Sequence, residues 1–551
     1  MKKRFLVPFV IFISLVIMAL LIKNEPCIQN IKSETATITV SRPVTTTVTM
    51  TKTTTKTVTM TKTIPVTKTN EIVRTVTATI TKSAIMTKTR ILTLTLTTIK
   101  KPPEIKYMEI FPNKTPDDKI TTFKLSFYII GNGTIEGKVI VTPVYYPNLN
   151  IEYEKQRVFK ISGGGFHKIN IPINGGKEYF VTIEACNEVG CSKKEMKTPY
   201  YREYNNLAKE LKEKGIIISA VYMPHSASYF CQEAEEEPLL GCFEDTSLDI
   251  VQWKHIDWAN GHGISVFWVD WTMLAWTSSK WRTLEVTRKL LEKNMTIGIM
   301  IGPISFTEIP IDLARHLGEY LEIVEEASKF MNYPSYYKIG GRPALFIWSE
   351  VVFSNRGNFY RKVYEVVKNQ TGSCPYIIAD LLPRIGYNFI IPGFSSFKEW
   401  YMWAITRKDD GGDVYIGGYT GWIGFYGVHK DDQGEYLPKE EFRKNFLEYY
   451  KVFVKEWRKF AEGRGKCFIP TVSPGFEKID RPGFIDYKIP RDPVRFKKML
   501  EYALENIGSC AEIRIDTWND FYEGTYVEPS ENEEFKFLNT LRNLLVELSS
   551  P

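Results

Sequence analysis

The chain lacks several patterns that mark nucleotide and metal chemistry. No glycine-rich phosphate-binding fingerprint follows the first strand-like run of its long C-terminal region, residues 216–224, as a dinucleotide-binding sheet would need. Its eight cysteines show no metal-ligand spacing, and His255 and His262 have no metal partner at a suitable spacing. We therefore expect no metal ion and no organic cofactor.

The chain also lacks basic character outside its N-terminal part. Residues 1–102 hold sixteen Lys and Arg against three Asp and Glu, a charge of +13, whereas the whole chain carries +7. The remaining residues are therefore mildly acidic. Because nucleic-acid binding needs a cluster of basic side chains on the folded part, we expect no nucleic-acid partner.

Residues 31–102 contain no aromatic residue at all. A segment of Thr, Val, Ile, Met and Lys without aromatic side chains is not expected to form a packed core. The unit TVTMTKT occurs at 47–53 and again at 57–63. Alternating Thr and Val favour an extended backbone, and the hydroxyl groups suit O-linked sugars. We predict an extended stalk; the alternative, an aggregation-prone array of strands, is disfavoured by the regular lysines.

The first thirty residues look like a membrane anchor. Residues 5–22 form an uncharged run long enough to cross the roughly 30 Å hydrocarbon core as a helix. Lys2, Lys3 and Arg4 precede it, and basic residues favour the cytoplasmic side. We predict a single-pass membrane protein with the bulk of its chain outside the cell. A cleaved signal peptide, giving a secreted protein, is the alternative.

Two cysteine pairs look like local disulfides, as an oxidising compartment allows. Cys186 and Cys191 flank a tight segment, and Cys231 and Cys242 bracket an acidic loop. Sequence alone does not fix their connectivity.

Residues 103–200 consist of short strand-like runs separated by Gly, Asn and Asp turns, which predicts a β-sandwich. The last run, EYFVTIEACNEVGCS, resembles the final hairpin of a fibronectin type III module. Such a domain beside an exported enzyme is either a spacer or a carbohydrate-binding accessory. We favour the spacer, since the sequence shows no evident cluster of exposed aromatic residues.

Residues 201–551 alternate between strand-like and helix-like segments. Amphipathic stretches with apolar residues at i, i+3 and i+4 separate most of the strands. The eight strand candidates are 216–224, 264–272, 296–303, 343–350, 375–383, 413–422, 467–476 and 511–520. This pattern predicts the α/β class and a (β/α)8 TIM barrel. A doubly wound sheet is the alternative.

Polar and aromatic residues gather at the C-terminal ends of these strands, where barrel enzymes carry their active sites. The candidate substrate-binding residues there are Tyr222, His225, Asp270, Trp271, Glu350, Trp422, Trp518 and Asn519. Each also has a structural interpretation: a carboxylate can cap a helix or pair with Arg, and a Trp or His can pack in the core. Together, aromatics at a barrel mouth favour a sugar-binding cleft.

The segment WNDFYEGTYVEPS, residues 518–530, resembles the W-N-E-W-x-E-G-T-x-x-E-P motif of family 99 glycoside hydrolases, the endo-α-mannosidases and endo-α-mannanases, and of family 99-like barrel proteins. The lead-in YYKIGGRPALFIWSE, residues 336–350, resembles the family's approach to the fourth strand. The likeness covers the barrel and neither the stalk nor the sandwich. It implies a retaining enzyme acting on α-linked mannose.

The same resemblance implies roles for two carboxylates. In the family, the first is thought to deprotonate the 2-hydroxyl of the substrate, giving a 1,2-anhydro sugar, and the second protonates the leaving oxygen and later activates water. By position these are Asp520 and Glu523. The family has Glu where this chain has Asp520, and the shorter side chain retracts the carboxylate by about 1 Å, a displacement that costs rate. Asp270 or Glu350 is then an alternative second carboxyl.

The sequence therefore predicts a membrane-anchored glycoside hydrolase that acts on an oligo- or polysaccharide, with α-mannosides among the candidate substrates. The predicted parts are residues 1–30 (anchor), 31–102 (stalk), 103–200 (sandwich) and 201–551 (barrel). The alternatives are a glycosyltransferase or transglycosylase of the family 99-like group, and a non-catalytic glycan-binding surface protein. The sequence does not set the oligomeric state.

Overall fold

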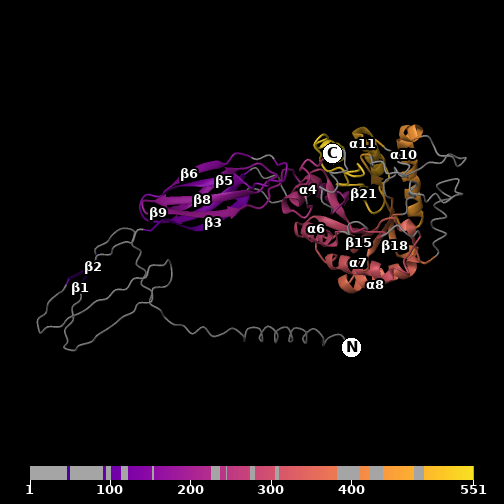
Figure 1. Ribbon diagram of the computed structural model, residues 1–551, viewed down its shortest axis with the longest axis horizontal. Coiled ribbons are helices and arrows are strands. Elements are labelled where there is room, and N and C mark those ends of the chain that lie inside the picture. The colour runs from indigo at the N-terminus through magenta and orange to yellow at the C-terminus, as the bar shows by residue number, and fades with distance from the viewer. Residues whose placement is uncertain are drawn as a thin grey trace, which may run out of the picture. The chain divides into compact units, whose positions relative to one another are not determined.

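The computed structural model describes most of the chain from residue 101 onward. The described ranges are 46–49, 91–94, 101–112, 122–151, 154–224, 236–243, 245–272, 279–304, 310–380, 410–421, 439–476 and 489–549. The chain divides into two compact units, 1–100 and 101–551. In the first, β1 (Thr46–Thr49) pairs antiparallel with β2 (Ile91–Leu94) (Figure 1). The apolar run 5–22 and most of the predicted stalk lie outside the described residues. Within the described ranges, no helix is both long and apolar enough to span a bilayer.

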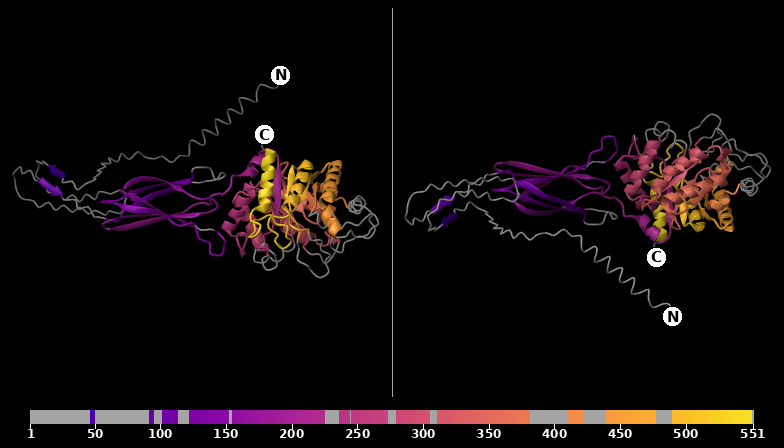
Figure 2. Two further views of the ribbon diagram at one scale, coloured as in Figure 1. Left: turned by 90° about the horizontal axis from the view of Figure 1, so that it is seen from above. Right: turned by 90° about the horizontal axis from the view of Figure 1, so that it is seen from below.

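The second unit begins with a β-sandwich of two antiparallel sheets (Figure 2). One sheet has the order β3-β4-β7 and the other β6-β5-β8-β9. Their bounds are β3 (Glu104–Pro112), β4 (Thr122–Ile130), β5 (Glu136–Pro143), β6 (Arg157–Ser162), β7 (Gly165–Pro172), β8 (Tyr179–Asn187) and β9 (Gly190–Lys197).

The sandwich core follows from the period-2 alternation of its strands. On β4, Phe123, Leu125 and Phe127 are fully buried, and Val139 of β5 and Val181 of β8 face the same core. The predicted Cys186–Cys191 disulfide is confirmed and closes the β8–β9 hairpin. The likeness to fibronectin type III modules stays a prediction.

The rest of this unit is an eight-stranded parallel barrel, as the sequence predicts. The strands are β10 (Ile217–Tyr222), β11 (Ile264–Asp270), β12 (Thr296–Ile301), β15 (Arg342–Ile347), β17 (Tyr376–Asp380), β18 (Ile416–Thr420), β19 (Cys467–Ile469) continued as β20 (Thr471–Val472), and β21 (Glu512–Ile515). Pro470 splits the seventh strand, because proline has no N–H for the ladder. The ring closes where β19 pairs with β18, β20 with β21, and β21 with β10.

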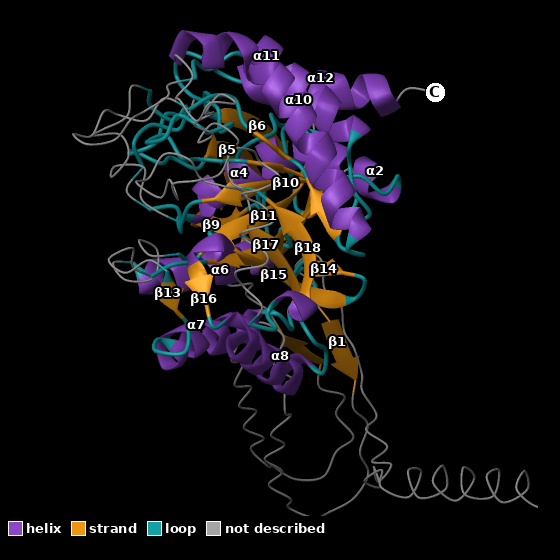
Figure 3. Cartoon of the chain, turned by 90° about the vertical axis from the view of Figure 1, so that its right-hand side faces the viewer, coloured by secondary structure: helices purple, strands orange, loops and turns teal. Residues whose placement is uncertain are grey.

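Helices cover the outside of the barrel, with α7 and α8 on one side and α10, α11 and α12 on another (Figure 3). Their bounds are α2 (Leu207–Glu213), α4 (Asp249–Gly261), α6 (Lys280–Glu292), α7 (Leu317–Phe330), α8 (Arg356–Thr371), α10 (Lys439–Gly463), α11 (Pro493–Glu505) and α12 (Lys536–Ser549). Helix α11 shows why such helices start where they do: Pro493 occupies its first position, and the side chain of Asp492 accepts from the N–H of Val494 at 2.8 Å.

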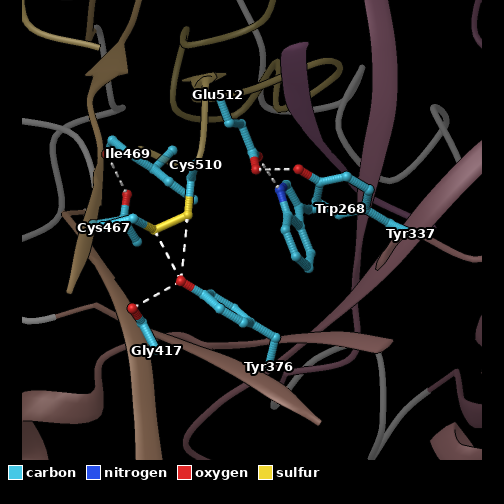
Figure 4. The surroundings of a disulfide bond; sticks show 9 residues. Trp268, Tyr337, Tyr376, Gly417, Cys467, Ile469, Cys510 and Glu512 are labelled. Carbon is cyan, nitrogen blue, oxygen red and sulfur yellow. Dashed lines mark hydrogen bonds between the residues drawn. A yellow bond between two sulfur atoms is a disulfide. The ribbon is translucent and has the colours of Figure 1, made fainter. Parts of the chain in front are cut away.

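A buried carboxyl lies inside the barrel. Glu512 accepts hydrogen bonds from Ser219 (2.6 Å), Trp268 (2.8 Å) and Tyr337 (2.8 Å) (Figure 4). Burial raises the pKa of Glu512 above its usual value. These contacts define which side chains point inward, because alternate residues of a strand share one face.

A second disulfide joins Cys467, at the start of β19, to Cys510, two residues before β21. The Tyr376 hydroxyl lies against its two sulfur atoms (Figure 4). The sequence did not indicate this pair. Cys242 is also disulfide-bonded, while its predicted partner Cys231 lies outside the described residues.

Candidate active site

The loop after β21 folds back on itself as a compact hairpin. Its first arm is held to its second by backbone hydrogen bonds: Thr517 N–H donates to the Thr525 carbonyl at 2.9 Å, and Glu528 N–H to the Trp518 carbonyl at 2.7 Å. The hydroxyls of Thr517 and Thr525 also contact each other at 3.1 Å. Gly524 adopts a φ of +63° at the bend, a conformation that favours glycine. The hairpin is thus held by contacts within the protein.

Asp520 and Glu523 lie in one turn at the tip of this hairpin. Asp520 N–H donates to Oγ1 of Thr517 at 2.9 Å, and Asp520 Oδ1 accepts from the N–H of Glu523 at 3.0 Å. Asp520 is 6% exposed, whereas Glu523 is half-buried. The two carboxylates predicted from the sequence are therefore neighbours, and Glu523 is the more accessible of them.

The aromatic residues around Glu523 pack on one another. Phe521 and Tyr526 stack with their ring centroids 3.8 Å apart, and the Arg491 guanidinium lies 3.6 Å from the Tyr526 centroid. Arg491 also donates to the carbonyls of Gly524 (2.8 Å) and Tyr526 (2.9 Å). Arg491 therefore clamps the second arm of the hairpin, and the sequence did not indicate it because it lies 27 positions before the motif.

Trp518 and Asn519 attach the hairpin to the end of β10. Trp518 N–H donates to the Val221 carbonyl at 2.7 Å. The Asn519 amide then pairs with the backbone of Met223, accepting from its N–H at 2.7 Å and donating to its carbonyl at 3.0 Å. The Asn519 side chain thus continues the hydrogen bonding along the end of β10, and it fixes the position of the loop through the backbone of Met223.

Tyr222, His255 and Glu528 form a buried chain behind the hairpin. The Tyr222 hydroxyl lies 3.0 Å from Nδ1 of His255, and His255 Nε2 lies 3.1 Å from Oε1 of Glu528. A neutral His255 satisfies both contacts if Nε2 carries the proton and Nδ1 accepts from Tyr222. Burial raises the pKa of Tyr222 well above its usual value, so its hydroxyl stays protonated. Tyr222, predicted to bind substrate, here faces α4.

Register separates the two candidates on β11. Trp268 points into the barrel toward Glu512, so Asp270 lies on the inner face and Trp271 on the outer face. Asp270 Oδ1 accepts from the N–H of Thr272 at 2.8 Å, and burial raises its pKa to about 6. Trp271 is fully buried in the helix layer, where its Nε1 donates to Thr287 of α6 at 3.0 Å.

Glu350 is held in a buried ion pair. It is fully buried, and its Oε1 contacts Nη1 of Arg356 at 2.5 Å and accepts from the Tyr360 hydroxyl at 3.2 Å. Arg356 also pairs with Asp410 (3.2 Å) and Asp413 (2.9 Å). These contacts tie Glu350 to α8, as expected for a residue with a structural role.

The inner face below the hairpin carries a second buried ion pair. Arg514 donates through Nε to Oδ1 of Asp516 at 2.8 Å, and its guanidinium lies 4.4 Å from the Phe346 ring centroid. Both side chains are almost fully buried. A strand places residues i and i+2 on one face, so this pairing was recoverable from the sequence, although it was not predicted.

Comparisons with known proteins show similarity to glycoside hydrolase structures at low identity. An endo-α-mannosidase of glycoside hydrolase family 99 from Bacteroides thetaiotaomicron is 15% identical, over 60% of this chain and 97% of that one, with a TM-score of 0.43. A β-galacturonidase of family 2 from Eisenbergiella tayi is 11% identical, over 81% of this chain and 72% of that one, with a TM-score of 0.30. No protein-family model and no curated protein matches the chain. Similarity of this extent does not identify a family.

The structure thus brings Trp518, Asn519, Asp520 and Glu523 together at the strand ends. The other candidates are placed apart: Asp270 on the inner wall, Tyr222 and Trp271 toward the helices, and Glu350 against α8. His225 and Trp422 lie outside the described residues. Among the described residues, Glu184, Cys186 and Cys191 are close enough to hold an ion, but the disulfide occupies both sulfurs.

Proposed function

We propose that the chain is a glycoside hydrolase that cleaves an oligo- or polysaccharide with Glu523 as acid and base. The observation that supports this most strongly is the shared turn of Glu523 and Asp520 at the C-terminal end of the last barrel strand. Catalytic residues of barrel enzymes lie at these strand ends. The turn is fixed by the hairpin, by Asn519 and by Arg491, so the two carboxylates are held in place before substrate arrives.

The two carboxyl groups differ in exposure and in hydrogen bonding. Glycoside cleavage needs one carboxyl that gives a proton to the leaving oxygen and another that stays ionised. Glu523 is half-buried and is the more exposed residue of the two, although its Oε2 is enclosed by protein. Asp520 accepts the N–H of Glu523 through Oδ1, so its carboxyl acts as a hydrogen-bond acceptor within the turn. We assign proton transfer to Glu523 and the anionic role to Asp520.

Asp270 is the competing second carboxylate. One oxygen of Asp520 serves the turn, and its side chain is shorter than the Glu of the family motif that residues 518–530 resemble. Asp270 lies on the inner face of β11, two strands from β21 around the barrel. If Asp520 serves only to shape the turn and no other carboxylate replaces it, the chain is a glycan-binding protein without catalysis, which is our second candidate function.

We further propose that the folded part lies outside the cell, attached through the apolar run 5–22. Two disulfides, Cys186–Cys191 and Cys467–Cys510, support an oxidising compartment. The resemblance of the hairpin sequence to family 99 makes α-mannosides the first substrates to test.

The test is product analysis of the full-length chain with α-mannan and a panel of other oligo- and polysaccharides. Wild type is compared with Glu523→Gln, Asp520→Asn and Asp270→Asn. Glu547→Gln, an exposed carboxyl on α12, is the matched control. Asp520→Asn keeps an oxygen that accepts from Glu523 N–H, so it removes charge while preserving the turn.

We expect Glu523→Gln and Asp520→Asn to lose product formation and Glu547→Gln to retain it. Loss in Asp270→Asn with retention in Asp520→Asn would transfer the second role to Asp270. Glycan binding by wild type without any product would refute the hydrolase and support the binding protein.

A further inference from the structure

The outer face of the three-stranded sheet carries a row of exposed aromatic side chains. Tyr107 of β3 is directly opposite Tyr128 of β4, and Tyr128 is directly opposite Phe166 of β7. Directly opposed residues of antiparallel strands project to the same side. The three rings are 39%, 40% and 54% exposed, although aromatic side chains of this size are usually buried. We call Tyr107, Tyr128 and Phe166 the aromatic row.

A polar row runs beside the aromatic row on the same face. It consists of Glu109, Ser126 and Lys168, which are also paired in register across β3, β4 and β7. Glu109 is hydrogen-bonded to the Tyr107 hydroxyl. At the other end, the Lys168 ammonium lies 5.1 Å from the Phe166 ring centroid. The polar row thus places an acceptor at one end and a cationic donor at the other, while Ser126 between them is buried (5% exposed).

The opposite sheet of the sandwich has a different outer surface. A hollow over β5, β8 and β9 is lined mostly by polar side chains and includes no aromatic residue; among its lining residues are Thr142, Thr182, Glu184 and Glu195. Phe180 of β8 and Val158 of β6 are also exposed on this sheet (37% and 55%), but their partners across β5 are Thr142 and Ile140, so they do not form a row of opposed aromatic rings.

We propose that the aromatic row and the polar row beside it form a carbohydrate-binding surface, separate from the barrel site. A sugar ring has an apolar face of C–H groups, which stacks on an aromatic ring, and a rim of hydroxyls, which needs donors and acceptors. Adjacent strands are separated by about 4.8 Å, so three rings in register extend over about 10 Å. This is long enough to lie beneath more than one sugar ring of a chain.

The pattern of charge and exposure favours a glycan over a protein partner. A protein-binding patch of this size would be expected to carry aliphatic side chains between its aromatics, whereas the row on one side here is polar. On the other side, Ile130 of β4 is an exposed aliphatic residue (39%). Glu109 and Lys168 carry opposite charges, so the face has no net charge to attract an ionic ligand. Lys168 is exposed, and its ammonium is able to leave the ring and donate to a sugar hydroxyl. This surface would hold polymeric substrate near the barrel. The sandwich would then be a carbohydrate-binding accessory module, the alternative to the spacer that the sequence favoured.

The experiment is affinity electrophoresis of the full-length chain in native gels that contain α-mannan, dextran or xylan. The Glu523→Gln form is used throughout, so that binding is measured without cleavage, and the detergent carries no sugar headgroup. The test variants are the triple Tyr107→Ala, Tyr128→Ala, Phe166→Ala and the single Phe166→Ala. The matched control is Trp281→Ala, which removes an equally exposed aromatic (62%) from α6.

We expect at least one polysaccharide to retard the Glu523→Gln form and the Trp281→Ala control equally. The triple variant should show an apparent dissociation constant weakened about tenfold or more, and Phe166→Ala an intermediate value. Because Phe166 is the most exposed of the three, its single variant tests the proposal even if the triple variant unfolds. The proposal would be overturned if Phe166→Ala and the triple variant were retarded as strongly as the parent Glu523→Gln form. It would also be overturned if no polysaccharide retarded the parent form. A change from dimer to monomer in the triple variant would overturn it as well, because it would assign the face to self-association.

Discussion

His255 Nε2 and Glu528 Oε1 lie 3.1 Å apart in the folded chain, although 273 residues separate them in sequence. The contact joins α4 to the second arm of the hairpin that carries Asp520 and Glu523. Both side chains are fully buried, so water cannot take the place of either partner if the other is removed. We infer that this pair holds the candidate catalytic turn against the body of the barrel.

Truncating Glu528 to Ala should lower the stability of the protein more than replacing it with the neutral, similarly shaped Gln. Glu528→Ala leaves the Nε2–H of His255 unpaired and opens a cavity in a buried site, so we expect the free energy of unfolding to fall by about 3 kcal/mol. Glu528→Gln keeps an oxygen for His255 Nε2 and should cost about 1 kcal/mol. Urea denaturation measures both values. Equal stability of Glu528→Ala and wild type would show that the contact does not support the hairpin.

The raised pKa of Asp270 predicts a pH-dependent stability. Its folded pKa is about 6, against 3.8 for an exposed carboxyl, because burial disfavours the charged form. A pKa raised by folding contributes stability that is complete below pH 3.8 and is lost as the pH rises through 6. Asparagine is neutral throughout. Hence the free energy of unfolding of Asp270→Asn minus that of wild type should increase by up to about 3 kcal/mol from pH 4 to pH 7. A difference independent of pH would contradict the burial of this carboxyl.

The two disulfides in the described residues should differ in their contribution to stability. Cys467–Cys510 closes 43 residues and Cys186–Cys191 closes 5. The chain-entropy model assigns about 4 kcal/mol to the longer loop and about 2 kcal/mol to the shorter. Thermal unfolding of the two double Cys→Ser variants measures the order. A larger loss of stability in the Cys186→Ser, Cys191→Ser variant than in the Cys467→Ser, Cys510→Ser variant would contradict this order.

Much of the fold follows from the sequence because the barrel strands are short, apolar and regularly separated. Seven of the eight strand candidates contain a strand of the observed barrel, and the eighth, 343–350, overlaps β15 (Arg342–Ile347). For example, β10, predicted over 216–224, is observed at Ile217–Tyr222. The Cys186–Cys191 pair was predictable because its cysteines are five residues apart on one hairpin. Cys467 and Cys510 were not, since only the closure of the barrel brings them together.

The sequence predicted the part of the candidate site whose residues are close together in the chain. It missed the contacts between residues that are far apart in the chain. Residues 518–523 lie together after the last strand, which ends at Ile515 where the sequence predicted a strand to residue 520. The orientation of Trp271 depends on register, which the hydrogen bond from Trp268 to Glu512 reveals and the local sequence does not. Likewise, Arg491, just before α11, and His255, on α4, reach the hairpin from segments remote in sequence. The aromatic row was missed because its three rings come from three separate strands.

The most direct test of Glu523 as acid and base compares two leaving groups. A poor alcohol leaving group needs a proton from the acid, whereas an activated one such as a dinitrophenolate departs without it. We predict that Glu523→Gln lowers kcat/KM by about a hundredfold to ten-thousandfold for an alcohol-leaving glycoside. The loss in the first, glycoside-cleaving step should be small for the dinitrophenyl glycoside of the same sugar. Equal losses for both glycosides, or unchanged turnover of the alcohol-leaving glycoside, would contradict the assignment.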